Sequence, residues 1–355
     1  MRYQQIGLLE HDPARAWPGY TLIAPLRTDM AYLVNMNGEI VHRWTLPGKL
    51  AATAYLWPGG RLAVSCESEG GPPVPQALGG NFYELDWDGA VVWHHLDPGQ
   101  HHDFRRLPNG NTIYPAWRLM DTAHQKRVLG GIAGTEHADG NIYEDVIREV
   151  SPDGELVWEW PMTSLEMEKY PLSDGALRYG YAHCNTLFPM DDGRILLCFR
   201  NMDMIAILNR ETGAFDWEMR DLTFGRPHDA RIVEDGRILL FANNCGNDML
   251  VPEHSRVLEI DPATKETVWV YKDRHSWTFH SSVASGANRL PNGNTLICET
   301  VWGRVFEVTR EGEIVWDFVN PIFETELPIS EGKGNWVFRA YRYAADGPEI
   351  DGNLP

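Results

Sequence analysis

The stretch Gly312-Glu-Ile-Val-Trp316 decides the fold, because a glycine, a short β-prone run and a tryptophan recur along the chain. Gly154-Glu-Leu-Val-Trp158 is nearly identical, and 89–93 and 213–217 follow the same pattern. Two copies are weaker: 264–269 lacks the glycine, and 38–42 ends on His42 with Trp44 two residues later. The last residues of the six copies (42, 93, 158, 217, 269 and 316) are separated by 51, 65, 59, 52 and 47 residues. A period near 50 residues is typical of an array in which each unit is one small sheet.

A tight-turn motif also occurs six times, in phase with the first. Most copies lie between β-branched or aromatic runs, which predicts hairpins. Two hairpins per unit make about four strands, and radial repetition of such units is a β-propeller. We therefore predict an all-β, six-bladed propeller with four-stranded blades around a central channel, formed by residues 1–355 as one domain whose terminal segments meet to close the ring. Two stacked β-sandwiches would also contain many short strands, but they would not explain six units in phase. The turns are Pro58-Gly-Gly-Arg61, Pro108-Asn-Gly-Asn111, Asp191-Asp-Gly-Arg194, Glu234-Asp-Gly-Arg237, Pro291-Asn-Gly-Asn294 and Ala345-Asp-Gly-Pro348.

Two segments, 119–146 and 161–180, interrupt the period. Insertions of this length in a compact domain are usually lids or specificity elements, and a disordered insertion is the alternative. We expect both over the channel mouth, where Arg178, Tyr179 and Tyr181 would contact an aromatic substrate.

Charge and composition exclude several classes of partner. The chain has 31 Lys and Arg against 50 Asp and Glu, a formal net charge of −19. A broad binding surface for nucleic acid or anionic lipid needs a positive field, so we expect neither partner. No signal peptide, membrane span or Cys-x-x-Cys pair is visible, and the five cysteines are scattered, which predicts a cytoplasmic protein with reduced thiols.

One repeat position should face the channel in every blade, because the innermost strand of each blade lines it. Counting back five residues from the apolar residue before each turn identifies this position, although the third repeat needs a turn two residues longer. Histidine occupies it in three consecutive repeats, which is hard to attribute to core packing. The six residues are Ala52, His102, His183, His228, Ser285 and Arg339.

Antiparallel pairing extends this site to the second strand of each blade. Phe188 and Ile195 flank one turn, so the residue numbers of each antiparallel pair in this hairpin should sum to 383. This places Arg200 opposite His183. Asn185 shares the face of His183. Asp103 and Asp229 directly follow their histidines, so we expect both to point away from the channel, towards neighbouring blades. The same arithmetic places Trp117 opposite His102, Asn243 opposite His228, Thr300 opposite Ser285 and Glu67 opposite Ala52.

Histidine, arginine, asparagine and serine around a narrow opening suit a compact oxyanion group. Transfer of a sulfuryl or phosphoryl group needs donors aimed at its oxygens, and a neutral imidazole can act as nucleophile or as general acid and base. The chain has no glycine-rich phosphate loop, so we expect no nucleotide donor and no cofactor.

These residues resemble the bacterial arylsulfate sulfotransferases, six-bladed propellers that transfer a sulfuryl group between phenols through a sulfohistidine. The resemblance spans about residues 30–345. It implies that His228 is the nucleophile and that His102, His183, Asn185 and Arg200 bind the sulfuryl oxygens and shuttle the phenolic proton. Unlike the periplasmic members, this sequence shows no signal peptide and no separate N-terminal β-domain. The motifs are His102-Asp103, His183-x-Asn185 with Arg200, His228-Asp-Ala-Arg231 with Leu-Leu-Phe-Ala-Asn243, and Phe338-Arg-Ala-Tyr-Arg-Tyr343.

Two other functions remain open from sequence. His102, His183 and His228, with Glu67 or His280, could hold iron, zinc or manganese for a lyase, hydrolase or oxygenase, although a nearby Arg200 would repel a cation. A ligand-binding propeller without catalysis is the other alternative. For a small aromatic substrate, we take the binding residues to be Asn185, Asn243, Ser285, Arg339, His280, Trp117, Tyr179 and Tyr181.

Overall fold

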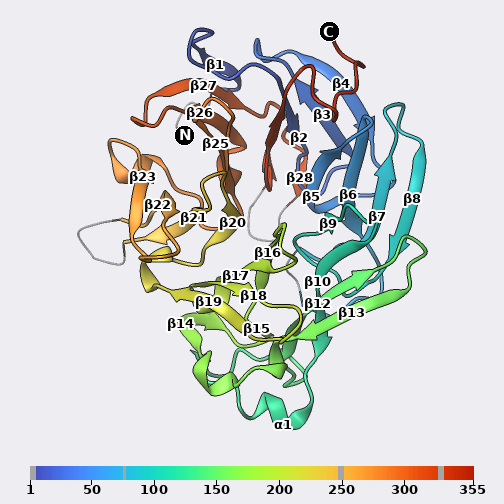
Figure 1. Ribbon diagram of the computed structural model, residues 1–355, viewed down its shortest axis with the longest axis vertical. Helices are drawn as coiled ribbons and strands as arrows, with labels where there is room; N and C mark the ends of the chain where they lie inside the picture. The colour runs from blue at the N-terminus through green and yellow to red at the C-terminus, as the bar shows by residue number, and fades with distance from the viewer. Residues whose placement is uncertain (1–4, 75–76, 247–251, 327–331) are drawn as a thin grey trace.

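The computed structural model describes residues 5–74, 77–246, 252–326 and 332–355. Within these ranges, six sheets of four or more strands surround a central axis, which confirms the six-bladed propeller (Figure 1). Each blade runs from an innermost strand at the axis to an outermost strand at the rim. Two further ribbons, β11–β14 and β28–β29, lie outside the blades.

The blades are numbered here from the one that closes the ring. Blade 1 contains β30 (Tyr341–Tyr343), β2 (Tyr20–Ile23), β3 (Met30–Val34) and β4 (Ile40–Thr45). Blade 2 contains β5 (Leu50–Trp57), β6 (Arg61–Glu67), β7 (Gly80–Leu85) and β8 (Val91–Leu96). Blade 3 contains β9 (Arg105–Arg106), β10 (Thr112–Leu119), β12 (Tyr143–Val150), β13 (Leu156–Pro161) and the added β15 (Gly180–Tyr181).

The other three blades follow in chain order. Blade 4 contains β16 (Cys184–Pro189), β17 (Ile195–Phe199), β18 (Met204–Leu208) and β19 (Phe215–Arg220). Blade 5 contains β20 (His228–Ile232), β21 (Ile238–Cys245), β22 (His254–Ile260) and β23 (Thr267–Tyr271). Blade 6 contains β24 (Gly286–Arg289), β25 (Thr295–Glu299), β26 (Arg304–Val308), β27 (Ile314–Val319) and β1 (Gly7–His11).

Both ends of the chain close the ring. The C-terminal β30 is the innermost strand of blade 1 and pairs with the N-terminal β2, with Thr21 opposite Arg342. At the rim, β1 pairs with β27 of blade 6, with Gly7 opposite Val319. These pairings satisfy backbone groups that an open ring would leave exposed. Five of the six predicted turns join the first two strands of a blade, whereas Ala345-Asp-Gly-Pro348 follows β30 and is no hairpin, because its partner strand comes from the other end of the chain.

The repeated tryptophans link each blade to the next. One tryptophan of each outermost strand donates its indole N–H to a backbone carbonyl in a turn of the following blade, at 2.7–3.1 Å. Buried indole N–H groups need such partners, so the motif recurs wherever two blades meet. In blade 3 the donor is Trp160 rather than Trp158, which stacks under Arg210 instead. The six bonds are Trp44 to Asp86, Trp93 to Pro152, Trp160 to Gly213, Trp217 to Pro262, Trp269 to Arg310 and Trp316 to Met36.

The two insertions form one substructure beside blades 3 and 4. The parallel pairing of β11 (Gly130–Ile132) with β14 (Leu172–Leu177) joins them. Their apolar residues pack into the same core cluster as β17 and β18. Figure 1 shows α1 (Thr122–Gln125) and β14 at the outer edge of the ring, while β15 leads inward to the channel.

The remaining short elements are single 3₁₀ turns and one small ribbon. No helix in the described ranges is long and apolar enough to cross a membrane. These elements are η1 (Met162–Ser164), η2 (Met167–Lys169), η3 (Arg200–Met202), η4 (Leu222–Phe224), η5 (Ser276–Thr278), η6 (Thr300–Trp302), β28 (Thr325–Glu326) and β29 (Lys333–Gly334).

Candidate active site

The innermost strands begin near the axis with a residue in the left-handed backbone region. This residue is His102 in blade 3, His183 in blade 4 and Ser285 in blade 6, with φ of 56°, 59° and 78°. In blade 5 it is Asp229, with φ of 55°. Non-glycine residues adopt positive φ rarely and at a cost, so its recurrence in four blades, at the repeat position in three of them and one residue later at Asp229, marks a feature that the surrounding fold enforces.

Two of the predicted histidines contact each other at the axis. Nε2 of His102 lies 3.0 Å from Nε2 of His183, and both side chains are buried. Burial, reinforced by neighbouring histidines, holds the pKa of His102 well below its usual range. Burial and the charge of Arg200 do the same to the pKa of His183. Both imidazoles are therefore neutral at neutral pH.

Behind this pair lie two residues that sequence reasoning did not identify. Nδ1 of His101 is 2.7 Å from Nδ1 of His102, and Nε2 of His101 is 3.2 Å from Oδ1 of Asp145. The ring of His101 also stacks on Trp117, with 4.2 Å between ring centroids. Strand alternation would place His101 on the opposite face from His102, and Asp145 lies on the third strand of its blade in no motif, so neither gave a usable signal.

His228, the predicted nucleophile, is held by an asparagine. Its Nδ1 lies 2.7 Å from Oδ1 of Asn243. The Nδ2 group of Asn243 donates to the carbonyls of Ser281 and Ala284, at 2.8 and 2.9 Å, so the amide oxygen must face the imidazole. The carbonyl of Arg226 is a second acceptor, 3.1 Å from Nδ1. Two acceptors at Nδ1 require that this atom carry the hydrogen, which leaves the lone pair on Nε2.

Two guanidinium groups surround these neutral imidazoles. Arg200 donates its backbone N–H to the carbonyl of His183 and its Nη1 to Asn201, at 3.0 and 3.1 Å. In the part of the chain that the structure describes, no carboxylate lies within ion-pair distance of its side chain. Burial and Arg226 lower the pKa of Arg200 to about 10, so it remains cationic. Arg226, which the sequence did not indicate, donates Nη2 to the carbonyl of Gly175 in the insertion, at 2.6 Å.

This combination favours an anion. Burial and Arg200 lower the pKa of His228 to about 3, so this imidazole is neutral as well. Arg200 therefore carries a positive charge without an ion pair in the described ranges, although Asp203 acts on it from a greater distance, and it lies beside a neutral imidazole with an available lone pair. An anionic group that reacts with a nucleophile is the ligand that such a site would stabilise.

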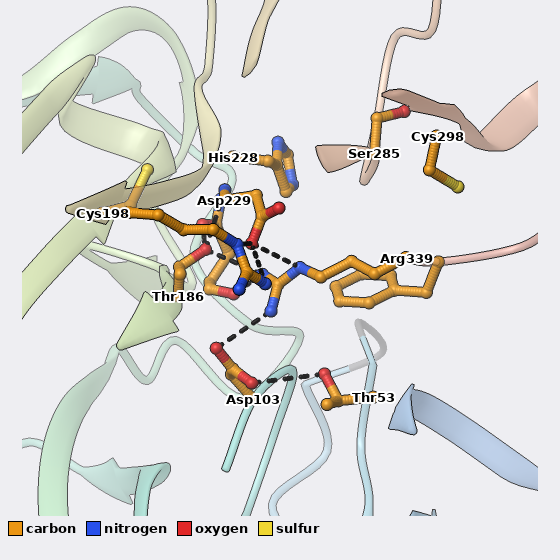
Figure 2. Close-up of polar contacts among 12 residues, drawn as sticks. Thr53, Asp103, Thr186, Cys198, His228, Asp229, Ser285, Cys298 and Arg339 are labelled. Atoms are coloured by element: carbon orange, nitrogen blue, oxygen red, sulfur yellow. Dashed lines mark hydrogen bonds and ion pairs between the residues drawn. The ribbon is translucent and has the colours of Figure 1, made fainter. Parts of the chain in front are cut away.

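Arg339 forms a buried ionic layer rather than a wall of the open site (Figure 2). Its guanidinium lies 2.9 Å from Asp103 and 3.1 Å from Asp229, and it donates to the carbonyl of Asn185 and to Thr186 Oγ1 at 2.8 and 2.7 Å. The prediction that both aspartates point away from the channel is therefore wrong, but their expected contacts with neighbouring blades are confirmed: the backbone N–H groups of Leu187 and Ala287 donate to Asp103 and Asp229, at 3.3 and 3.1 Å. Alternation applies to extended backbone, and the left-handed residues His102 and Asp229 break it.

Other candidates are already bound to protein groups. Asn185 donates Nδ2 to the carbonyl of Pro227, at 2.7 Å, and so links blade 4 to the residue before His228. Ser285 shares a hydrogen bond with Thr300, with 3.2 Å between their hydroxyl oxygens. The contact of Asn185 crosses to blade 5, whereas that of Ser285 stays within blade 6.

The aromatic candidates divide into two groups. Trp117 lies edge-on to His183, with 5.7 Å between ring centroids, and its buried Nε1 has no hydrogen-bond partner among the described residues. Tyr179 packs beside Trp117. Tyr181 instead points into the insertion and donates to the carbonyl of Tyr170, at 3.1 Å, which takes it away from a substrate.

The remaining predicted partners deviate from simple hairpin arithmetic. His280 bonds through Nε2 to Asn244, at 3.1 Å, on the loop between blades 5 and 6. Glu67 does not face Ala52, because β5 contains a bulge between positions 50 and 54. It pairs with Arg27, 3.2 Å away, and lines a cavity of about 260 Å³.

The geometry does not favour the metal alternative. Among the described residues, no group of three His, Cys, Asp or Glu side chains is arranged to hold a metal ion. The Nε2 atoms of His102 and His183 face each other at hydrogen-bond distance, and Nδ1 of His228 is bound to Asn243. Arg200 and Arg226 add positive charge where a cation would have to bind.

Comparison with known proteins agrees with this picture. The arylsulfotransferase (ASST) family matches residues 80–321. Comparison with the curated proteins gives no match. Among solved structures, a protein of unknown function from Bacteroides caccae is 14% identical with a TM-score of 0.55, covering 92% of this chain and 99% of its own. A protein from Lactobacillus plantarum is 11% identical with a TM-score of 0.51, covering 92% and 100%. At such identities these two structures support the fold alone.

Proposed function

The chain belongs to the arylsulfotransferase family, and from this and the site we propose that it transfers a sulfuryl group from an aryl sulfate to a phenol through an adduct on His228. The observation that carries the proposal is the state of His228. Its Nδ1 is hydrogen-bonded to Asn243 at 2.7 Å, so its Nε2 holds the lone pair of a neutral imidazole. A nucleophile in this form attacks without first losing a proton.

In the first half-reaction, Nε2 of His228 attacks the sulfur of the donor. The S–O bond to the aryl oxygen breaks, and its electron pair leaves with the phenolate. Arg200 is proposed to bind the sulfuryl oxygens, and its positive charge stabilises both the transferring group and the departing oxygen. Nδ1–H of the sulfated His228 continues to donate to Asn243, which keeps the adduct oriented.

In the second half-reaction, the oxygen of an acceptor phenol attacks the same sulfur. The N–S bond breaks, and its electron pair returns to Nε2 of His228. The acceptor must lose its phenolic proton, and the neutral pair His102 and His183 provides imidazole nitrogens for this step. Trp117 and Tyr179 supply aromatic surface beside the site for the aryl ring.

Incubation with 4-nitrophenyl sulfate tests the proposal. We expect 4-nitrophenol release that accelerates when phenol is added, together with a gain of one sulfuryl group in the intact-protein mass that maps to His228. His228→Ala should abolish both signals. His254→Ala is a matched control, because His254 is also a buried histidine of blade 5 but bonds to Pro252 and Arg256. Turnover without an adduct on His228, or no turnover with any aryl sulfate, would contradict the proposal.

A further inference from the structure

Four titratable side chains lie in one series of close contacts at the axis, in which an ion-pair contact joins Asp145 to His101 and hydrogen bonds join the three histidines. Asp145 contacts Nε2 of His101, Nδ1 of His101 contacts Nδ1 of His102, and Nε2 of His102 contacts Nε2 of His183, with distances of 3.2, 2.7 and 3.0 Å. All four side chains are buried. Only His102 and His183 of this series have a place in the proposed mechanism so far.

The carboxylate of Asp145 determines which ring nitrogen of each histidine in the series carries the hydrogen. Its oxygens accept the backbone N–H groups of His183 and Cys184, at 2.7 and 2.8 Å, so it acts as an acceptor to every neighbour. Nε2 of His101 must therefore carry a hydrogen to face Oδ1. A buried carboxylate holding an imidazole in one tautomer is a known way to orient a catalytic histidine.

Each contact fixes the next, because a hydrogen bond between two ring nitrogens contains one hydrogen. In neutral His101 the hydrogen is on Nε2, so Nδ1 is an acceptor and Nδ1 of His102 must donate to it. Nε2 of His102 is then an acceptor, and Nε2 of His183 must donate to it. The lone pair at the end of the series is on Nδ1 of His183.

The geometry points to His101 and Asp145 as positioning residues for the transfer: Asp145 orders the hydrogens through His101 and His102 so that Nδ1 of His183 is the basic atom that accepts the proton of the acceptor phenol. This inference rests on the proposed function, and it adds a route for the proton. Neither residue touches the substrate.

The proton balance closes over one cycle. When Nδ1 of His183 takes the phenolic proton, its Nε2–H passes to Nε2 of His102, and Nδ1–H of His102 passes to Nδ1 of His101. His101 then carries a hydrogen on both nitrogens and faces the Asp145 carboxylate. The reverse sequence returns one proton to the phenolate that leaves in the next donor half-reaction.

The three histidines of the series have different charged neighbours. Burial lowers the pKa of both His102 and His183, and the charges of Arg200 beside His183 and of Arg339 beside His102 add to this effect. His101 instead faces the carboxylate of Asp145 and the π face of Trp117. Within the series, the carboxylate therefore lies at the end away from the substrate.

The first test reads the tautomers directly in the unmodified protein. Long-range ¹H–¹⁵N correlation spectra of ¹⁵N-histidine-labelled protein at neutral pH report which ring nitrogen is protonated, and single substitutions assign the rings. We expect hydrogens on Nε2 of His101, Nδ1 of His102 and Nε2 of His183. Hydrogen on Nε2 of His102 or on Nδ1 of His183 overturns the inference, whatever the protein's activity.

The second test separates the two half-reactions. His101→Phe keeps an aromatic ring on Trp117 but interrupts the series. Adduct formation from 4-nitrophenyl sulfate should stay within about threefold of the wild-type rate, because 4-nitrophenolate leaves without a proton. Discharge of the adduct to unsubstituted phenol should slow by about 100-fold or more, the contribution typical of a lost general base. His95→Phe, on the outermost strand of blade 2, is the matched control and should change neither rate.

The outcomes are distinguishable. Unchanged discharge, or an equal loss in both half-reactions, overturns the positioning role. If the unmodified protein forms no adduct, the proposed function fails, and the tautomer spectra still decide the hydrogen order. If His101→Phe does not fold, those spectra decide alone.

Discussion

Asn243 holds His228 in a single tautomer: its amide oxygen lies 2.7 Å from Nδ1, and its amide N–H₂ is fixed by the carbonyls of Ser281 and Ala284. If the amide of Asn243 were flipped, its N–H₂ group would face Nδ1–H of His228, and its oxygen would face the carbonyl oxygens of Ser281 and Ala284. The carbonyls of Ser281 and Ala284, on the loop between blades 5 and 6, therefore fix the orientation of Asn243. Asn243 in turn keeps the hydrogen of His228 on Nδ1 and its lone pair on Nε2.

Replacing this asparagine should slow formation of the adduct. In Asn243→Ala, Nδ1 keeps only the more distant Arg226 carbonyl, so the reactive tautomer loses its main stabilisation. We expect the burst rate with 4-nitrophenyl sulfate to fall by about 2- to 13-fold, because the net contribution of one hydrogen bond is about 0.5–1.5 kcal/mol. Asn244→Ala is the control, since Asn244 bonds to the carbonyls of Gly225 and Ser282 and to His280. Equal burst rates in the two variants would argue against tautomer control.

Arg200 should contribute mainly to the rate of sulfuryl transfer. Arg200→Met removes a cation that has no carboxylate partner in the described ranges, so the fold loses little while the transition state loses its charge stabilisation. We expect the adduct to form about 100- to 1,000-fold more slowly, as for removal of one preorganised donor. Arg220→Met, an exposed arginine at the end of β19, serves as the comparison. Pre-steady-state release of 4-nitrophenol measures both, and a fall of less than threefold in Arg200→Met would remove Arg200 from the mechanism.

The fold could be predicted because the repeated residues have the same structural role in each blade. Each glycine-to-tryptophan unit ends on an outermost strand, and its tryptophan bonds to the next blade, so the same residues recur at each blade junction. Trp160 shows the limit of this reasoning: it replaces Trp158 as the donor, although Trp158 has the same register as the donor tryptophans of four other blades.

The candidate site was predictable only where the backbone is regular. The repeat register brought His102, His183 and His228 to one level, and the structure places Arg200 opposite His183 through a backbone hydrogen bond. Near the turn, however, Phe188 pairs with Leu196 rather than Ile195. A bulge between Cys184 and Thr186 then shifts the register by one residue, so that the numbers of paired residues again sum to 383, as predicted.

Left-handed residues explain most of the other differences. Positive φ at His102 and Asp229 directs consecutive side chains to the centre, a geometry that period-two alternation does not anticipate. His101, Asp145 and Arg226 were not identified as site residues from the sequence. Their neighbours at the site come from three blades, and a single sequence gives no signal for such contacts.

The buried arginine beneath the histidines should govern stability. Arg339→Met leaves Asp103 and Asp229 without their shared cation, and both carboxylates are fully buried. Each aspartate keeps a second arginine, with Arg105 3.3 Å from Asp103 and Arg231 2.9 Å from Asp229. We therefore expect the free energy of unfolding by urea to fall by at most about 3–5 kcal/mol, the cost when a buried ion pair loses one partner. Arg194→Met, in the exposed pair with Asp192, should cost less than about 1 kcal/mol. Equal losses in these two variants would show that the ionic layer is unimportant for folding.

The neutral histidines should lower the stability of the protein in mild acid, whereas Glu299, whose pKa burial raises to about 7, acts in the opposite direction. His102, His183 and His228 all have a pKa in the folded state below that of an exposed imidazole, which is about 6.5. Below pH 6.5 the unfolded chain binds protons at these positions while the folded chain does not, so their contribution to the free energy of unfolding must fall as the pH falls. Each histidine adds up to about 1.4 kcal/mol per pH unit to this slope.

Urea unfolding followed by tryptophan fluorescence between pH 8 and pH 5 measures this dependence. His228→Gln should reduce the slope below pH 6.5 by the equivalent of one proton, because the unfolded chain then has one fewer imidazole to charge. His94→Gln, on the outermost strand β8, should leave the slope closer to that of the unmodified protein. A slope that is the same in all three proteins would mean that the His228 imidazole is not held neutral in the folded state.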